Sequence, residues 1–149
     1  MFEAYLDSRV LDKLERHFAL AAEKNLEAMG LLAGRVCRWK GADYVLVDEY
    51  LTSRNAATPV SVRFERAGLA ELVSGLVEKG GKRIIVGWAH SHPGYGCFLS
   101  QTDLDTQRAF FGEPFNVALV VDPLRKEKKF FKLDGVGYRE ASFAVVKTR

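Results

Sequence analysis

Histidine and carboxylate side chains gather in residues 87–107, whose sequence is GWAHSHPGYGCFLSQTDLDTQ. His90 and His92 are one residue apart. In an extended backbone residues i and i+2 point to the same side, so both imidazoles can reach one metal ion. After a further ten residues, Asp103 is expected in the first turn of a helix. Two histidines and one carboxylate leave a coordination position of zinc open for water, which is typical of catalytic rather than structural sites.

Other candidate ligands do not extend this set. Cys37 and Cys97 are the only cysteines of the chain, so a cysteine-rich structural zinc site cannot be built. The third histidine, His17, lies on the edge of an expected helix, where a surface or hydrogen-bonded role is the usual one. The chemistry is therefore concentrated in residues 87–107.

The spacing from His90 to Asp103, HxHP followed by six residues and SxxD, resembles the motif of the JAMM (MPN+) metalloprotease family. The flanking GYGCFLS is similar to that of the proteasome-lid deubiquitinase subunit and the signalosome isopeptidase subunit in this family. The similarity extends from the first expected helix to about Leu133. It implies an MPN (JAMM) domain with one Zn²⁺ per chain, held by His90, His92 and Asp103.

The resemblance also implies roles for two further residues. Glu27 opens EAMGLLAG, which is similar to the family's Glu-x-x-Gly-x-x-x-Gly, and would be the general base and acid. A solvated acid at a helix–strand junction is the alternative. Zinc lowers the pKa of its water toward about 7, and Glu27 would accept the proton and deliver it to the leaving amine. Ser100 would stabilise the oxyanion, although it also suits the N-cap of the next helix.

The substrate implied by the resemblance is an isopeptide bond between a lysine amine and the C-terminal glycine of ubiquitin or a ubiquitin-like protein. Such a tail needs a groove along a sheet edge. The family supplies it by an insertion that corresponds here to about 53–66, where TPVSVRF alternates well enough to pair with a tail. An ordinary connecting loop is the alternative. Gly94, Tyr95 and Gly96 suit a flexible flap, and individual substrate-binding residues stay unassigned.

Alternatives come from other classes of protein. A JAMM hydrolase can act on a sulfur-carrier protein or a small-molecule amide, and a non-catalytic MPN scaffold usually lacks some of the ligands. A nucleic-acid-binding module would depend on Leu124–Lys132, which holds five basic groups and one acid. That run is expected in a solvated hairpin turn without aromatic interleaving. Partners among nucleic acids or membranes are therefore not expected.

Departures from the family pattern bear on the partners. Ala89 stands where the two most similar branches usually carry an aromatic, and Phe98 replaces a tryptophan. The sequence ends at Arg149, without the long C-terminal helices that dock those subunits in their complexes. The expectation is a short relative or a truncated catalytic domain, and a proteasome-like partner rests on the resemblance alone.

Hydrophobic periodicity and turn residues predict the elements that position these side chains. Residues 89–99, rich in Gly, His and Pro, are expected to be irregular. The fold class is α/β (α+β), with a curved, mostly antiparallel central sheet, about three flanking helices and a zinc site at a strand–loop–helix junction. Strands are expected at 1–6, 30–39, 42–52, 83–88, 115–121, 129–133 and 138–147, and helices at 8–25, 69–77 and 100–111.

Length and composition limit the class of protein that this chain can be. The 149 residues suit one catalytic domain spanning 1–149, large enough to fold without a structural metal. Hydrophobic residues make up 48% and charged residues 28%, which excludes a disordered chain. The net charge is +3, and the basic run near residue 128 accounts for it. Without a signal peptide or an apolar span, the expected protein is soluble and cytoplasmic.

Overall fold

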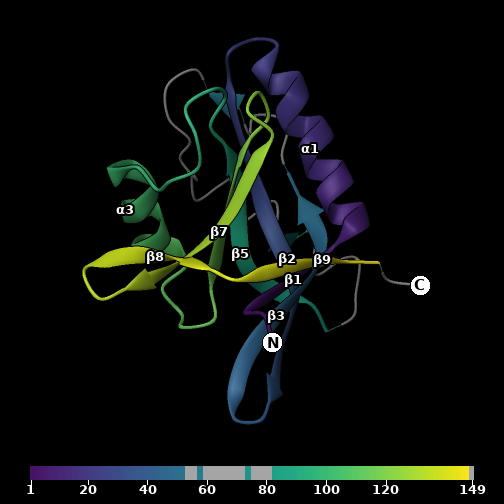
Figure 1. The fold of residues 1–149 in the computed structure, drawn as a ribbon, viewed down its shortest axis with the longest axis vertical. Helices are drawn as coiled ribbons and strands as arrows, with labels where there is room; N and C mark the ends of the chain where they lie inside the picture. The colour runs from purple at the N-terminus through teal and green to yellow at the C-terminus, as the bar shows by residue number, and fades with distance from the viewer. Residues whose placement is uncertain (53–56, 59–72, 75–81, 148–149) are drawn as a thin grey trace.

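The computed structural model describes residues 1–52, 57–58, 73–74 and 82–147, which fold around one curled, mixed β-sheet (Figure 1). The elements follow one another as β1 (Ala4–Asp7), α1 (Ser8–Ala22), β2 (Glu27–Trp39), β3 (Ala42–Leu51), β4 (Ala57–Thr58), β5 (Ile84–Ser91), α3 (Gln101–Phe110), β6 (Val117–Asp122), β7 (Glu127–Asp134), β8 (Gly137–Ala141) and β9 (Phe143–Val146).

The sheet runs in the order β8-β7-β6-β5-β2-β3-β1-β9, and β4 pairs with β2 outside that order. Its pairs are antiparallel except for β1–β3, β1–β9 and β5–β6, so the predicted mostly antiparallel sheet is confirmed. β8 and β9 stand at opposite ends of the order, yet only Ser142 separates them in the chain. The sheet therefore curls until its ends meet, and Figure 1 shows β8 and β9 in line across the molecule.

The long strand β2 lies between β3 and β5 and carries an irregularity that bends it. Its register shifts between Ala33 and Gly34 toward β3, and between Leu32 and Ala33 toward β5. A shift of this kind kinks a strand and increases its twist. A Cβ on Gly34 would collide with the carbonyl oxygen of Leu46, so the close approach of the two backbones requires glycine here.

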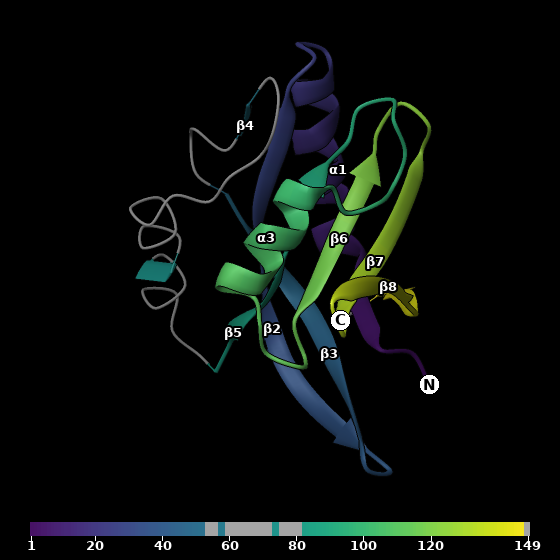
Figure 2. The ribbon, with the colours of Figure 1, turned by 90° about the vertical axis from the view of Figure 1, so that its left-hand side faces the viewer.

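Among the described helices, α1 lies on one face of the sheet and α3 on the other (Figure 2). The Asp7 side chain caps α1 by accepting a hydrogen bond from the Arg9 amide at 2.9 Å. The apolar stripe of α1 packs on one face in a core that includes Leu14, Phe18, Leu32, Val47 and Leu119. On the other face α3 packs in a second core that includes Met29, Leu31, Trp88, Leu104 and Phe111.

Strand β5 differs from its prediction. It continues through Ala89, His90 and Ser91, which the sequence analysis placed in an irregular segment. The reason is long-range pairing: His90 lies opposite Met29 of β2 and Val120 of β6, so the sheet holds it on both sides. Glycine and proline interrupt the chain only after this strand ends.

Some of the remaining expectations are confirmed, some are corrected, and some concern residues outside the described part of the chain. Most of the other strands, with α1 and α3, lie close to their predicted ranges, but the single strand expected at 138–147 is two strands, β8 and β9, separated by Ser142. The expectation that the basic run Leu124–Lys132 forms a solvated turn is wrong. The turn covers only residues 123–126, and the rest of the run belongs to β7. The expected helix at 69–77 and the expected insertion at 53–66 lie mostly outside the described residues. No helix in the described part of the chain has the length and apolar character needed to cross a membrane.

Candidate metal centre

The two motif histidines are placed by the end of strand β5. His90 is fully buried within the strand, and His92 is buried directly after it. The His92 amide donates to the carbonyl of Val121 at 2.9 Å, which continues the contact with β6 beyond the strand. The predicted same-side placement is confirmed, because the two Nε2 atoms lie 3.1 Å apart.

Asp103 reaches the histidines from the first turn of α3. Ser100 caps this helix: its Oγ accepts a hydrogen bond from the Asp103 amide at 3.1 Å, and its own amide donates to Asp103 Oδ2 at 2.9 Å. This reciprocal capping box fixes the carboxylate at the helix start. Asp103 Oδ2 then lies 3.0 Å from His90 Nε2 and 3.1 Å from His92 Nε2.

The three atoms form a nearly equilateral triangle that suits a metal ion. The ligand atoms of a tetrahedral zinc site, with bonds of 2.0–2.1 Å, are about 3.3 Å apart. His92 Nδ1 lies 3.1 Å from the Gly96 carbonyl, which can only accept, so this nitrogen carries the proton. The lone pair of His92 Nε2 therefore faces the oxygen of Asp103, and a cation between them satisfies both.

Burial and charge favour the protonation states that metal binding requires. Burial lowers the pKa of His90, and the neighbouring Asp103 only partly opposes this effect. Burial alone would raise the pKa of Asp103, but its close contacts with the His90 and His92 imidazoles and with the Ser100 amide outweigh burial and hold that pKa far below its ordinary value. A neutral His90 beside an ionised Asp103 is ready to bind a divalent cation.

Glu27 lies on the same face of the sheet as the cluster. It is the first residue of β2, is buried, and pairs with Thr58 of β4. Met29, two residues later, lies opposite His90, and alternate residues of a strand share one face. Glu27 therefore points to the side that carries His90, at the end of β2 nearest His92. Its carboxylate does not belong to the group formed by His90, His92 and Asp103.

Aromatic rings enclose the two imidazoles. Trp88 stacks on His90 with ring centroids 4.4 Å apart, and its indole N–H donates to Gln107 Oε1 at 2.5 Å. Since His90 Nδ1 has no hydrogen-bond partner among the described residues, Trp88 is a main restraint on this ring. Tyr95 and Phe98, 44% and 39% exposed, lie against His92 with centroids 4.8 Å away. They form the exposed side of the centre.

Trp88 and Gln107 were missed by the sequence analysis. Both follow from periodicity once the ligands are known: Trp88 is two residues before His90 on a strand, and Gln107 is four residues after Asp103 on a helix. Cys97, by contrast, lies outside the cluster, and its thiol donates to the Val120 carbonyl at 3.3 Å. The two cysteines are free.

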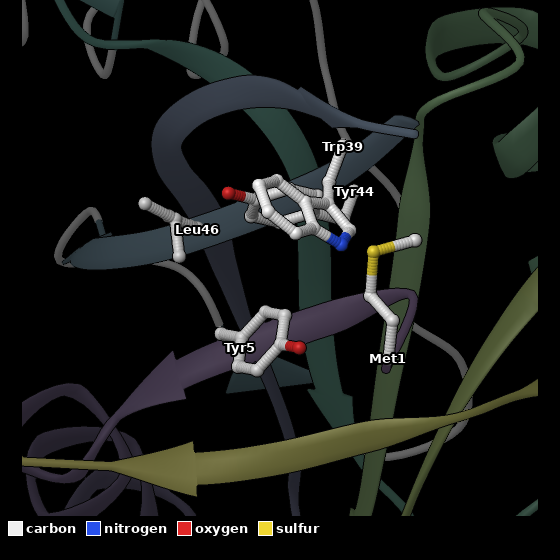
Figure 3. A pocket seen from close by; sticks show the side chains of 5 residues that line it. All are labelled: Met1, Tyr5, Trp39, Tyr44 and Leu46. Carbon is white, nitrogen blue, oxygen red and sulfur yellow. The ribbon is translucent and has the colours of Figure 1, made fainter. Parts of the chain in front are cut away.

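A separate pocket has a volume of about 480 Å³, and Figure 3 shows the side chains that line it. Trp39, which lines it, is ten residues along β2 from Met29, or roughly 30 Å at the usual rise of a strand. Among the described residues, those that line this pocket include no histidine, cysteine or carboxylate. Its lining consists of Met1, Tyr5, Trp39, Tyr44 and Leu46.

The curled sheet with its buried His-His-Asp cluster defines a metallohydrolase of the JAMM/MPN type. The family model described as JAB1/Mov34/MPN/PAD-1 ubiquitin protease matches residues 3–112, and the chain belongs to this family. A protein from Desulfitobacterium hafniense, known from a solution structure, shares the fold. Its TM-score is 0.72 at 20% identity, over 97% of this chain and 94% of that one.

Similar curated proteins come from eukaryotic complexes. The 26S proteasome regulatory subunit RPN11 of Eremothecium gossypii is 36% identical over 135 residues, covering 83% of this chain and 39% of that protein. The COP9 signalosome complex subunit 5 of Caenorhabditis elegans is 40% identical over 105 residues, covering 68% and 27%. The ubiquitin carboxyl-terminal hydrolase RPN11 of Saccharomyces cerevisiae is 35% identical over 129 residues, covering 83% and 40%. The chain thus spans 40% or less of their lengths.

Proposed function

We propose that residues 1–149 form one catalytic domain, a zinc-dependent isopeptidase that cleaves ubiquitin or a ubiquitin-like protein from lysine amines. The observation that carries the proposal is the triangle of His90 Nε2, His92 Nε2 and Asp103 Oδ2, with sides of 3.0–3.1 Å. Two imidazoles and one carboxylate are ligands of catalytic zinc. The metal, when bound there, supplies a water of lowered pKa and polarises the scissile carbonyl.

The protein's own groups would perform the proton transfers and stabilise charge. Glu27 would take the proton of the attacking water and return it to the leaving lysine amine, which is the usual work of a positioned carboxylate. The Ser100 hydroxyl would donate a hydrogen bond to the oxygen of the attacked carbonyl, where negative charge develops. Two observations support these roles: the Ser100 hydroxyl accepts a hydrogen bond from the Asp103 amide, and Glu27 shares the sheet face of His90.

The substrate class is supported by the relatives and by the exposed side of the centre. One of the similar proteins is a ubiquitin carboxyl-terminal hydrolase, and the family model carries ubiquitin protease in its description. The exposed rings of Tyr95 and Phe98 would form a wall for an extended tail, and Gly94 and Gly96 add no side chains of their own to that wall. A proteasome-like partner is proposed from the same relatives, which are subunits of large complexes. A cytoplasmic location agrees with two free cysteines.

Metal analysis combined with cleavage of isopeptide-linked ubiquitin conjugates tests this proposal. We expect about one zinc per chain, inhibition by a chelator, and a loss of kcat of about 10²–10⁴-fold in Glu27→Gln, because a general base contributes that much. Glu23→Gln is the matched control, since Glu23 is an exposed acid at the end of α1. It should keep the full activity.

Two outcomes would contradict the proposal. Full activity in Glu27→Gln would remove Glu27 from the mechanism. Zinc binding without cleavage of any ubiquitin-like conjugate would replace the substrate class by a sulfur-carrier protein or a small-molecule amide.

A further inference from the structure

The carboxylate of Asp122 is fully buried at the end of β6, and the proposed mechanism does not use it. Its Oδ1 accepts hydrogen bonds from the amides of Gly94 at 2.9 Å, Leu124 at 3.0 Å and Arg125 at 3.0 Å. Its Oδ2 accepts from the amide of Gly96 at 2.7 Å. The Arg125 guanidinium lies 3.8 Å from Oδ2. One buried carboxylate thus holds two separate loops.

The two groups of hydrogen bonds join Asp122 to different segments of the chain. Those to Leu124 and Arg125 are local and close the turn between β6 and β7, as Asp side chains often do. Those from Gly94 and Gly96 come from the loop that follows His92, and these residues are 28 and 26 positions away from Asp122 in the chain. A turn needs only the local pair, so the second pair requires another explanation.

The second pair holds backbone that carries a contact to the metal centre. Gly94 and Gly96 have φ values of +89° and +85°, a region that favours glycine. The carbonyl of Gly96 is the acceptor for His92 Nδ1 at 3.1 Å. The chain of contacts therefore runs from Asp122 through Gly96 to His92. These bonds hold the loop at both glycines and do not support the expected flexible flap.

We propose that Asp122 is a positioning residue that sets the tautomer and orientation of His92. By fixing Gly96, Asp122 keeps a carbonyl opposite His92 Nδ1, so that the proton stays on Nδ1 and the lone pair of Nε2 faces His90 and Asp103. The partner of the distal histidine nitrogen in metal sites orients the ring and increases its basicity as a ligand. The inference rests on the proposed function only in taking His92 as a metal ligand.

The charge state of Asp122 agrees with this role. Burial would raise the pKa of this carboxyl, but the backbone amides of Arg125, Gly94, Gly96 and Leu124 outweigh burial and hold the pKa below its ordinary value. The carboxylate therefore stays ionised at neutral pH and accepts all four bonds. An asparagine side chain of the same size has only one accepting oxygen, so it cannot accept the hydrogen bonds that Oδ1 and Oδ2 of Asp122 accept.

The variant Asp122→Asn tests the inference by two measurements. In a competition with a chelator at fixed pH, we expect zinc affinity about 10–100-fold below that of the wild type, the usual cost of losing a group that orients a ligand. In the metal-free protein, NMR of the His92 ring should show the Nδ1–H form in the wild type and a mixture of tautomers in the variant. Asp134→Asn, at an exposed aspartate that ends β7, is the matched control and should match the wild type in both.

A second variant keeps the test decisive if Asp122→Asn does not fold. Gly96→Ala leaves Asp122 in place but strains the backbone at positive φ, and it should weaken zinc binding in the same direction. Unchanged zinc affinity and an unchanged His92 tautomer in a folded variant would overturn the inference. A wild type that binds no zinc would overturn the proposed function instead, and the His92 tautomer in the metal-free protein would still test Asp122.

Discussion

The Ser100 hydroxyl can serve two partners at once, because a hydroxyl has one proton and two lone pairs. As N-cap of α3 it uses a lone pair to accept the Asp103 amide at 3.1 Å. Its proton remains available for donation to the oxygen of an attacked carbonyl. The roles of Ser100 as helix cap and as hydrogen-bond donor to the substrate are therefore compatible.

Substitutions at Ser100 should separate these two roles. Ser100→Ala loses both the cap, at a cost of about 0.5–2 kcal/mol, and the donor, at a cost of about 10²–10³ in kcat. Ser100→Gly keeps most of the capping energy, because glycine is only a few tenths of a kcal/mol worse at an N-cap. We expect Ser100→Gly to lose activity like Ser100→Ala but to unfold close to the wild-type temperature. Activity that follows the unfolding temperature in both variants would assign Ser100 to the cap alone.

At the scale of elements, the position of the metal centre depends on how tightly β5 lies against β6. The two strands are parallel and begin their pairing at Gly87 and Val117. A Cβ on Gly87 would collide with the Val117 carbonyl oxygen, and backbone cannot move aside as a flexible side chain can. Since His90 lies three residues further along β5, a displacement here moves a ligand.

The substitution Gly87→Ala should therefore reduce both stability and zinc affinity. Overpacking typically costs about 1–3 kcal/mol, which corresponds to a fall in Tm of roughly 2–12 °C for a domain of this size. Gly112→Ala is the control, because its Cβ would lie 3.4 Å from the nearest atom, the Arg108 carbonyl oxygen. It should change the free energy of unfolding by less than about 0.5 kcal/mol. A Gly87→Ala protein as stable as the wild type would show that β5 and β6 can move apart at this point without a loss of stability.

Elements with strong periodicity could be predicted from the sequence, whereas features set by distant neighbours could not. The apolar spacing from Val10 to Phe18 specified α1, and Ser100 followed by Asp103 specified the start of α3. The extension of β5 through His90 depends on β2 and β6, which no local pattern records. The contacts of Asp122 likewise join segments 26 and 28 residues apart. The spacing predicted that His90, His92 and Asp103 lie together, and they do, because one strand end and one helix start position all three.

At the scale of the whole molecule, the metal centre is attached to a fold that has its own cores. One core lies between α1 and the sheet and the other between the sheet and α3, and neither depends on a metal ligand for its apolar contacts. The curled sheet joins both, since β2 and β5 contribute residues to each core. A chain of about 150 residues buries roughly 68–70% of its unfolded surface. The fold should therefore persist without the metal.

Removal of the metal by a chelator should leave a folded protein of lower Tm. A ligand that binds only the native state adds RT ln(1 + [L]/Kd), about 2.7 kcal/mol at 100 Kd, so zinc should raise Tm by roughly 5–11 °C. Circular dichroism and thermal unfolding with and without zinc measure both quantities. Glu27→Gln should show the same zinc-dependent rise as the wild type, because Glu27 is not one of the clustered ligand atoms. Loss of cooperative unfolding in the chelated wild type would instead make the metal structural, and an absent rise in Glu27→Gln would place Glu27 among the ligands.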